Sequence, residues 1–527
     1  MKKLLLLLII GCAATAWGKP VENEMYFRAM KDEMNRTLRE LRLPGEVKPF
    51  YVAYWVNELT NFQRGASLGS LLAVTPEEHR VLVQGVVEVG SEADSSRGFA
   101  RSEEQDMPRW WVPVSYEGLR MGLWKLSDKL YLDSVERYKQ KKAYLRKKNM
   151  QDKLPDFVPV KSGVFIEEIT PWQVPDSVAL ETWLKKVSGW GKEIAFVEDF
   201  VVVGYASKND RYFLNSRGGK SQTEYTEHSV LVYAEFRQPD GYKETKQQRF
   251  YVRDLSREEL TRAESKIRTF LDTVQTQYGA KTGEAYVGPV LYKPSSAADF
   301  LRVLLLGKLS RTVPFLVEDS DEDLQASPWR KKLGQRILSP GIAIYDRPQA
   351  TEFEGISLEN KEIDLEGVPT QELVLVSNGR LQELPLGQRP LDKKHASNGH
   401  AFFADQIAPR EGLSNVFVES ETQLTDEQME EKLLERCREL ELEYCYIQHS
   451  FGDFERIYSK DGHKERIVGL EDANLSARSL RDIEVAGGKP QLSRGRLDII
   501  TPSLLINEVE VIPQDRKPGR KPFVTKP

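Results

Sequence analysis

Two stretches in the first third of the chain place apolar residues three and four positions apart. The first runs from Phe27 to Leu41 among charged residues and ends at Pro44-Gly45. The second begins after Ser115 and continues into a basic run that ends at Lys148. This spacing lines one face of an α-helix with apolar side chains. Both stretches are therefore predicted to form amphipathic helices.

Short apolar and aromatic runs separated by polar residues predict strands between and after these helices. β-Branched and aromatic residues favour strands, while Asn, Asp and Gly tolerate the backbone angles of tight turns. We therefore expect antiparallel strands joined by short turns. The strands predicted in this half cover residues 50–56, 67–74, 80–89, 164–169, 194–205, 212–214, 229–236 and 248–252.

Two further helices are predicted in the same half, over residues 177–187 and 256–278. A proline-rich connector precedes the first of them. Ser256 and Glu259 have the spacing of a capping box, in which each side chain bonds the backbone of the other residue. Gly279 suits the C-cap of this helix.

The second half of the chain is richer in strands. An apolar helix is predicted over residues 297–306 and a second helix over residues 426–440. The predicted strands cover residues 288–292, 342–345, 372–376, 415–419, 444–449, 466–470 and 504–512. Hairpin-linked strands mixed with helices are typical of α+β proteins rather than of a doubly wound parallel sheet.

We therefore expect an α+β fold of two domains with antiparallel or mixed sheets. The predicted boundaries give a signal peptide over residues 1–18, an N-terminal α+β domain over 19–285 and a β-rich domain over 286–512. The tail, residues 513–527, is basic and proline-rich and is expected to be disordered.

Composition narrows the functional classes. The chain has 527 residues, with 75 Lys and Arg against 80 Asp and Glu, for a formal charge of −5. This balance argues against a dedicated nucleic-acid-binding protein, which normally carries a basic domain. Apolar residues make up 40% of the chain, which is enough for a folded core and too much for a disordered polyampholyte.

The first residues have the order of a secretory signal. Lys2 and Lys3 precede an apolar run over residues 4–10, and small residues follow. Ala14-Thr15-Ala16 suits ordinary signal peptidase, whereas residues 9–12 resemble a bacterial lipobox that would lipidate Cys12. Both outcomes predict a periplasmic or secreted protein, free or lipid-anchored. No later stretch has the roughly 20 apolar residues of a transmembrane helix.

Cys437 and Cys445 are the two cysteines outside this signal. In an oxidising compartment they can pair, provided that a turn separates them. A single continuous helix would hold their Cα atoms about 12 Å apart, beyond the roughly 7 Å limit for a disulfide. The sequence leaves open both a disulfide and two partly buried thiols.

The six histidines give no catalytic or metal pattern, and no H-E-x-x-H or H-E-x-x-x-H helix occurs. Cys437, Cys445, His449 and His463 make the best metal set. Strand-like sequence around Cys445 would place Cys445 and His449 about 13 Å apart, too far to share one ion. There is no G-x-S-x-G nucleophile elbow, and Leu214 stands where a P-loop needs its first glycine. No metal site, cofactor or catalytic residue is therefore assigned.

Several segments appear in the order found in one protein family. They are the strand and turn at 211–218, Gly288-Pro289-Val290-Leu291, Leu333 to Pro348, Asp364 to Thr370, Ser377 to Leu381, Ser397 to His400 and Pro409 to Asn415. Together they resemble the TldD/PmbA family over residues 195–512, and residues 21–190 are similar to its exported branch. The resemblance implies a metallopeptidase-related fold.

Catalytic members of that family are zinc peptidases with an H-E-x-x-x-H helix shortly after the Gly-Pro strand. The corresponding helix here, residues 299–305, reads Asp-Phe-Leu-Arg-Val-Leu-Leu and has no ligand pair. No histidine lies between His228 and His395. The chain thus resembles the PmbA-like half of the system, which implies a non-catalytic, peptide-handling subunit. Its partners would be unfolded peptide and either a second copy or a TldD-like zinc-bearing protein.

The turn Asn398-Gly399-His400 is the predicted peptide contact. Two alternatives remain open. An active metallopeptidase would take its ligands from unconventional positions such as His395, His400 and Glu419. A structural or surface-binding protein would bind no peptide and have no related partner.

Overall fold

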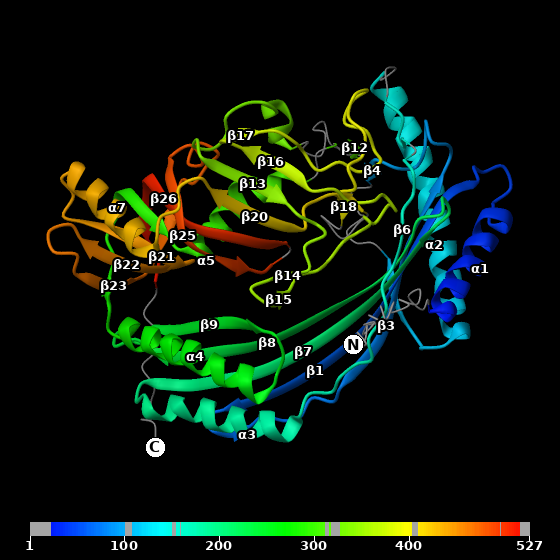
Figure 1. Cartoon of the computed structure of the whole chain (residues 1–527). Coiled ribbons are helices and arrows are strands. Elements are labelled where there is room, and N and C mark those ends of the chain that lie inside the picture. Colours follow the sequence, from blue (N-terminus) through cyan, green and yellow to red (C-terminus); the bar gives the residue numbers. More distant parts are fainter. Residues whose placement is uncertain are drawn as a thin grey trace, which may run out of the picture.

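The computed structural model describes residues 23–100, 108–149, 154–158, 160–310, 313, 316–317, 327–402, 409–495 and 497–516. The expected export signal and Cys12 lie outside these residues, as does the expected tail from residue 517 onward. The chain folds into two large sheets with helices beside them, which confirms the predicted α+β class (Figure 1). None of the helices in the described ranges is long and apolar enough to span a membrane.

The N-terminal sheet is built from long antiparallel strands. Its order is β5-β3-β1-β7-β8-β6, with β2 paired to β1 and β9 paired to β8. The strands are β1 (Pro49–Ser67), β2 (Ser70–Leu71), β3 (Glu78–Val89), β5 (Arg109–Val112), β6 (Val164–Ile166), β7 (Val197–Asn215), β8 (Lys220–Arg237) and β9 (Lys243–Val252). Only the short β6 runs parallel to its neighbour, β8.

Several strand predictions were wrong in their bounds. β1 is one strand of 19 residues and absorbs the start of the predicted 67–74 strand, of which β2 keeps two residues. β7 also has 19 residues and joins the predicted 194–205 and 212–214 strands. Polar residues in the middle of each strand break the apolar pattern. Their backbones remain paired, as between Glu58 and Asp210, so the strand continues.

Helices α1 (Glu24–Glu40), α2 (Tyr116–Lys147), α3 (Ser177–Ser188) and α4 (Arg257–Gln277) cover one face of this sheet. Side chains alternate between the two faces of a strand. Even-numbered positions of β1 contact α1 and α2 at one end, through Val52 and Val56, and contact α3 at the other, through Ala66. The odd-numbered face is therefore free of these helices.

The predicted capping box of α4 forms only in part. The Ser256 hydroxyl accepts a hydrogen bond from Glu259 N at 3.4 Å. The Glu259 carboxylate instead accepts from Arg253 N, and Ser256 N donates to Asp254. Asp254 therefore accepts the hydrogen bond from Ser256 N that Glu259 would accept in a complete capping box.

The C-terminal sheet mixes parallel and antiparallel pairs, in the order β10-β23-β22-β21-β11-β26-β20-β13-β16-β17, with β24 and β25 also on β26. Its strands are β10 (Lys281–Thr282), β11 (Tyr286–Tyr292), β13 (Ile342–Asp346), β16 (Leu373–Ser377), β17 (Arg380–Leu381), β20 (Asn415–Ser420), β21 (Tyr444–Ser450), β22 (Asp453–Tyr458), β23 (Lys464–Val468), β24 (Leu470–Ala473), β25 (Ile483–Ser493) and β26 (Asp498–Pro513). Helices α5 (Pro294–Leu301) and α7 (Asp426–Glu439) pack beside it. Short paired strands lie outside the two large sheets: β4 (Phe99–Ala100) with β12 (Leu316–Val317), β14 (Glu352–Phe353) with β15 (Ile356–Ser357), and β18 (Ala401–Phe402) with β19 (Arg410–Glu411).

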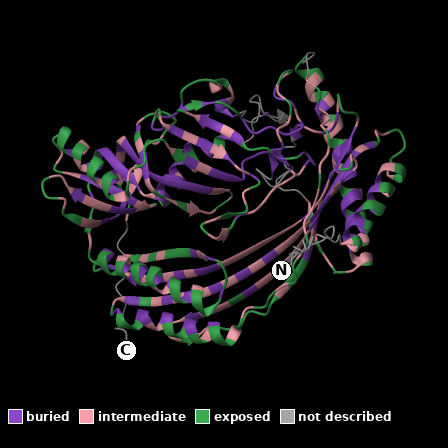
Figure 2. Cartoon of the chain, in the orientation of Figure 1, coloured by how far each residue is buried: buried purple, intermediate pink, exposed green. Residues whose placement is uncertain are grey.

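The C-terminal part lies against the face of the N-terminal sheet that the helices leave free. In Figure 1 the long strands curve beneath the C-terminal sheet, with α1 and α2 at one end and α3 and α4 at the other. Tyr51, Ala53 and Trp55 on the odd-numbered face of β1 form a buried cluster against which Leu365 packs. Figure 2 shows buried and half-buried residues alternating along the long strands, as expected for a sheet whose two faces differ.

Candidate functional site

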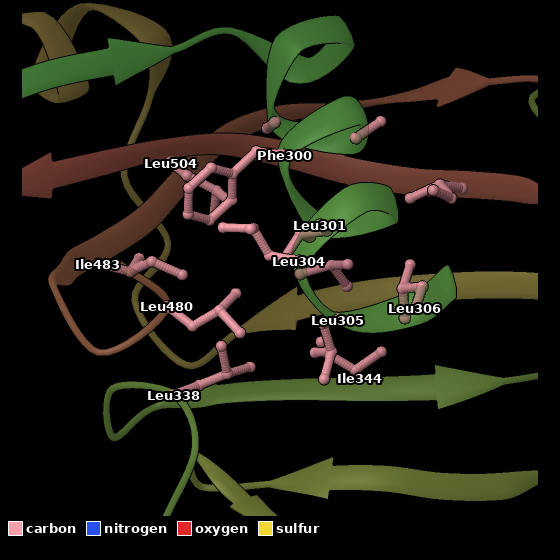
Figure 3. Close-up of a cluster of buried hydrophobic side chains, with 14 of the residues drawn as sticks. Phe300, Leu301, Leu304, Leu305, Leu306, Leu338, Ile344, Leu480, Ile483 and Leu504 are labelled. Carbon is pink, nitrogen blue, oxygen red and sulfur yellow. The ribbon is translucent and has the colours of Figure 1, made fainter. Parts of the chain in front are cut away.

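The helix that the family resemblance singles out is part of the main hydrophobic core. α5 continues through a π-helical turn, Arg302–Leu306, into the short α6 (Gly307–Leu309). Figure 3 shows its apolar side chains pointing toward β13, β25 and β26. The buried members include Ala297, Phe300, Leu301, Leu304, Leu305 and Leu306, packed with Leu338, Ile344, Leu480, Ile483 and Leu504. This face presents carbon to a packed interior rather than polar side chains to a cavity.

The opposite side of the same helix is polar and half exposed. Asp299 and Arg302 form an ion pair one turn apart. Arg302 Nη2 also lies 3.5 Å from the carbonyl oxygen of Ser493, at the end of β25. The helix therefore abuts the turn that links β25 to β26.

That turn also forms one wall of a pocket between the two parts of the chain, with a volume of about 240 Å³. The opposite wall comes from β8 and β9, and the remaining walls come from the loop after β15 and from the start of β20. The lining residues are Tyr225, Glu227, Tyr251, Glu359, Lys361, Ser414, Asn415, Arg494, Gly495, Leu497 and Asp498.

Arg494 holds this pocket together. Its side chain is 6% exposed, and its Nη1 lies 3.0 Å from Glu227 Oε2 and also contacts the Tyr225 hydroxyl. The guanidinium carbon lies 4.5 Å from the centre of the Tyr251 ring, a cation–π distance. Nη2 donates to the carbonyl of Ser357. One guanidinium thus joins the turn before β26 to two strands of the N-terminal sheet.

The pocket carboxylates differ in their electrostatics. Burial tends to raise the pKa of Glu359, but the nearby charges of Arg211 and Lys361 outweigh it and lower that pKa to about 2. Burial raises the pKa of Asp498 to about 6, against the opposing effect of Arg494 and Lys361. Glu359 is therefore held as an anion, while Asp498 changes charge within the range of mild acidity.

The predicted peptide-contact turn lies inside the domain. The Asn398 side chain accepts from Leu386 N at 2.8 Å and donates to Leu384 O at 2.9 Å. Gly399 has φ +74°, and a Cβ there would lie 2.3 Å from Pro369 O, so only glycine fits. These groups are bonded within the domain, and the peptide contact at Asn398-Gly399-His400 stays a prediction.

His400 completes this turn and is fully buried. Its Nδ1 lies 2.9 Å from Asn398 O, and its Nε2 lies 3.2 Å from Asp346 Oδ2. Asp346 is also fully buried and accepts hydrogen bonds from the backbone and hydroxyl of Ser414. His400 is therefore neither a solvated turn residue nor an exposed ligand.

The other residues that the sequence singled out are dispersed. His395 pairs with Asp392, Glu419 with Arg347, and His449 with Glu455. Cys437 and Cys445 form a disulfide with their Cα atoms 6.0 Å apart, across the turn between α7 and β21. Within the described ranges, no group of three or more His, Cys, Asp or Glu side chains is arranged to hold a metal ion.

Sequence reasoning missed Arg494 and Asp498. The ion pair from Arg494 to Glu227 spans 267 positions. Asp498 reaches the pocket because β26 begins beside β20, with Asp498 opposite Asn415 in a parallel pair. Neither residue belongs to a local pattern, so no signal in one sequence marks them.

Comparison with known proteins gives the class and then the family. Residues 286–513 match the family model of the PmbA/TldA metallopeptidase C-terminal domain, so this part is a metallopeptidase-related domain. No curated protein matches the chain. The C-terminal domain, residues 286–513, therefore belongs to the TldD/PmbA family.

Solved structures share the whole fold at low sequence identity. TldE from Thermococcus kodakarensis superposes with a TM-score of 0.62 and 16% identity, over 92% of this chain and all of that one. A proposed modulator of a DNA gyrase from Thermotoga maritima superposes with a TM-score of 0.60 and 15% identity, over 92% of this chain and 100% of that one. A proposed modulator of DNA gyrase from Bacteroides thetaiotaomicron superposes with a TM-score of 0.60 and 12% identity, over 93% of this chain and 98% of that one. At these identities the likeness establishes the fold alone.

Proposed function

We propose that this chain is a zinc-free, peptide-handling member of a TldD/PmbA-type assembly and does not cut peptide bonds by itself. The observation that carries this proposal is the segment from α5 to α6, whose inward face is packed apolar core. A zinc peptidase would need imidazole and carboxylate groups on this helix. Burying such groups without partners in this core would be costly.

The face of the N-terminal sheet turned toward the C-terminal part supports a role in holding polypeptide. Its half-buried positions carry hydrogen-bonding side chains, such as the pair formed by the Tyr205 hydroxyl and Asn61 at 2.9 Å. Arg249 and Ser229 form a similar pair on β9 and β8. An extended peptide offers donors and acceptors along its whole length, which a polar sheet face of this kind can satisfy.

Export is part of the same proposal. The signal-like sequence at residues 1–18 and the disulfide between Cys437 and Cys445 both suit an oxidising compartment. We therefore place the protein in the periplasm or outside the cell, free or anchored through Cys12. Its proposed partner is a second copy or a TldD-like zinc-bearing protein.

The test uses the purified full chain with a fluorescent, unfolded protein whose amino groups have been acetylated. We expect binding by fluorescence anisotropy, no cleavage and no stoichiometric zinc by metal analysis. The same protein in its folded form is the control and should bind weakly. Tightly held zinc at one equivalent, with cleavage abolished by a chelator, would show an active metallopeptidase instead. Absence of binding would favour the structural alternative.

A further inference from the structure

The pocket between β8, β9 and the β25–β26 turn contains a carboxylate, that of Asp498, whose burial is offset by few polar contacts. The Asp498 side chain is 13% exposed, and its ion pair is with Arg494 Nε at 3.5 Å. Among the described residues, this carboxylate accepts no hydrogen bond. A buried carboxylate is normally hydrogen-bonded, because ionised groups lose much of their hydration on burial.

The other two acids of the pocket have cations of their own. Glu227 is 3.0 Å from Arg494, and Glu359 is paired with Arg211. The guanidinium of Arg494 already bonds Glu227, Tyr225 and Ser357. Its distance to Asp498, 3.5 Å from Nε, is therefore longer than its distance to Glu227. Three acids and two bases line the pocket, Glu227, Glu359 and Asp498 against Lys361 and Arg494. Arg211 behind Glu359 balances the charges, so the Asp498 carboxylate, which accepts no hydrogen bond from the described residues, is the acceptor that the pocket offers to a small cation.

We propose that this pocket binds a primary ammonium group, with Asp498 as its main acceptor. Building on the proposed peptide-handling function, we assign that group to the amino terminus of an extended peptide. An ammonium offers three donors, which suits Asp498 together with neighbouring oxygens such as those of Glu227 and Glu359. The volume of about 240 Å³ suits one end of a chain rather than a folded partner.

The position of the pocket agrees with this assignment. Its turn wall is also the contact point of Arg302, on the helix where the family resemblance places the catalytic centre of zinc-bearing relatives. A peptide anchored at Asp498 would extend from there along the polar face of the N-terminal sheet. The pocket would thus fix one end of a bound chain.

Binding should depend on pH because Asp498 must be ionised to accept the ammonium. The charged and titratable groups that face it are Glu227 and Tyr225 on β8, Tyr251 on β9, Glu359 and Lys361 on the loop after β15, and Arg494. Of the acids, Glu359 is held ionised by Arg211 and Lys361, whereas the pKa of Asp498 is near 6. Affinity should therefore rise between pH 5 and pH 7.5.

The experiment measures binding of alanine peptides to the full chain by isothermal titration calorimetry. The probes are trialanine amide with a free amino terminus, the same peptide acetylated, and an acetylated Ala-Lys-Ala amide. We expect the free peptide to bind and the acetylated peptide to bind at least about tenfold more weakly, as for loss of a charge-assisted hydrogen bond. Asp498→Asn should weaken binding of the free peptide by a similar factor. Asp272→Asn, an exposed and isosteric change on α4, should leave it unchanged.

Equal binding of the free and acetylated peptides would overturn the proposal, as would an unchanged affinity in Asp498→Asn or no binding at millimolar peptide. Binding of the acetylated lysine peptide as tightly as the free peptide would reject the assignment to amino termini. Circular dichroism of Asp498→Asn checks that the variant is folded. The assay for the proposed function uses an acetylated protein, so it can succeed even if this pocket binds no amine.

Discussion

Two buried regions of the C-terminal part differ in how they are stabilised. The segment from α5 to α6 contributes side chains such as Leu304 and Leu305 to a core of carbon contacts. The turn that carries His400 buries polar, ionisable side chains instead, with Asp346 and His400 both fully inaccessible. The first region tolerates small errors in position, because apolar contacts are not directional. The second depends on specific partners, and losing one leaves another charge unpaired.

The polar region also explains one of the family-like motifs. The Asp364 carboxylate accepts hydrogen bonds from the backbone of Glu366, Val368 and Ala401, at 2.9, 2.9 and 3.0 Å. Gly367 follows with φ +86°, and a Cβ there would lie 2.5 Å from the side-chain nitrogen of Asn215 in the N-terminal sheet. The motif over residues 364–370 is thus a turn that seats one part of the chain on the other.

The largest expected effect comes from removing the buried Asp346 carboxylate. Asp346→Ala removes the partner of His400 Nε2 and of the Ser414 backbone and hydroxyl. We expect it to lower the free energy of unfolding by about 3–5 kcal/mol, measured by urea denaturation. Asp346→Asn keeps an acceptor for Ser414 and should cost less. Equal losses in both variants would contradict the role assigned to the charge.

A truncation in the apolar region should have an effect of similar or smaller size. Leu304→Ala removes a side chain that is 2% exposed and should cost about 2–5 kcal/mol of unfolding free energy. The adjacent Val303 is 63% exposed, so Val303→Ala should change stability by less than about 0.5 kcal/mol. Both are read from the same denaturation series. If the two variants matched, the helix would not have the sidedness described above.

The smallest expected effect is a pH dependence. Because burial raises the pKa of Asp498 from 3.8 to about 6, folding favours its protonated form. Its contribution to stability is fully present below pH 4 and is lost as pH rises through 6, by at most about 3 kcal/mol. Asp498→Asn should remove that loss, so its stability relative to the native sequence should increase from pH 4 to pH 7. A constant difference across this range would contradict the prediction.

The sequence predicted those parts of the fold that depend on local pattern. The helices α1, α2, α3, α4 and α7 were found because their apolar spacing repeats over several turns. The apolar character of residues 297–306 and the family resemblance were also visible, and the family model confirms the latter. The predicted ends of strands were wrong where a polar stretch lay inside a long strand, as between Glu58 and Arg64 in β1.

The candidate site was much less predictable. His400 was predicted to contact peptide, but its side chain is buried beside Asp346, which lies more than 50 positions earlier. The pocket depends on Arg494 reaching β8 and on the register between β20 and β26. Charged residues are mostly exposed, so one sequence gives no reason to expect any particular one of them to be buried. Only the tertiary arrangement distinguishes these residues from the other charges of the chain.

The position of β26 has a consequence for how the protein is made. This strand pairs with β11, β20, β24 and β25, and it follows all four of them along the chain. The C-terminal sheet therefore cannot close until residues 498–513 have been synthesised. A product that terminates before residue 498 would leave four strands without their common neighbour.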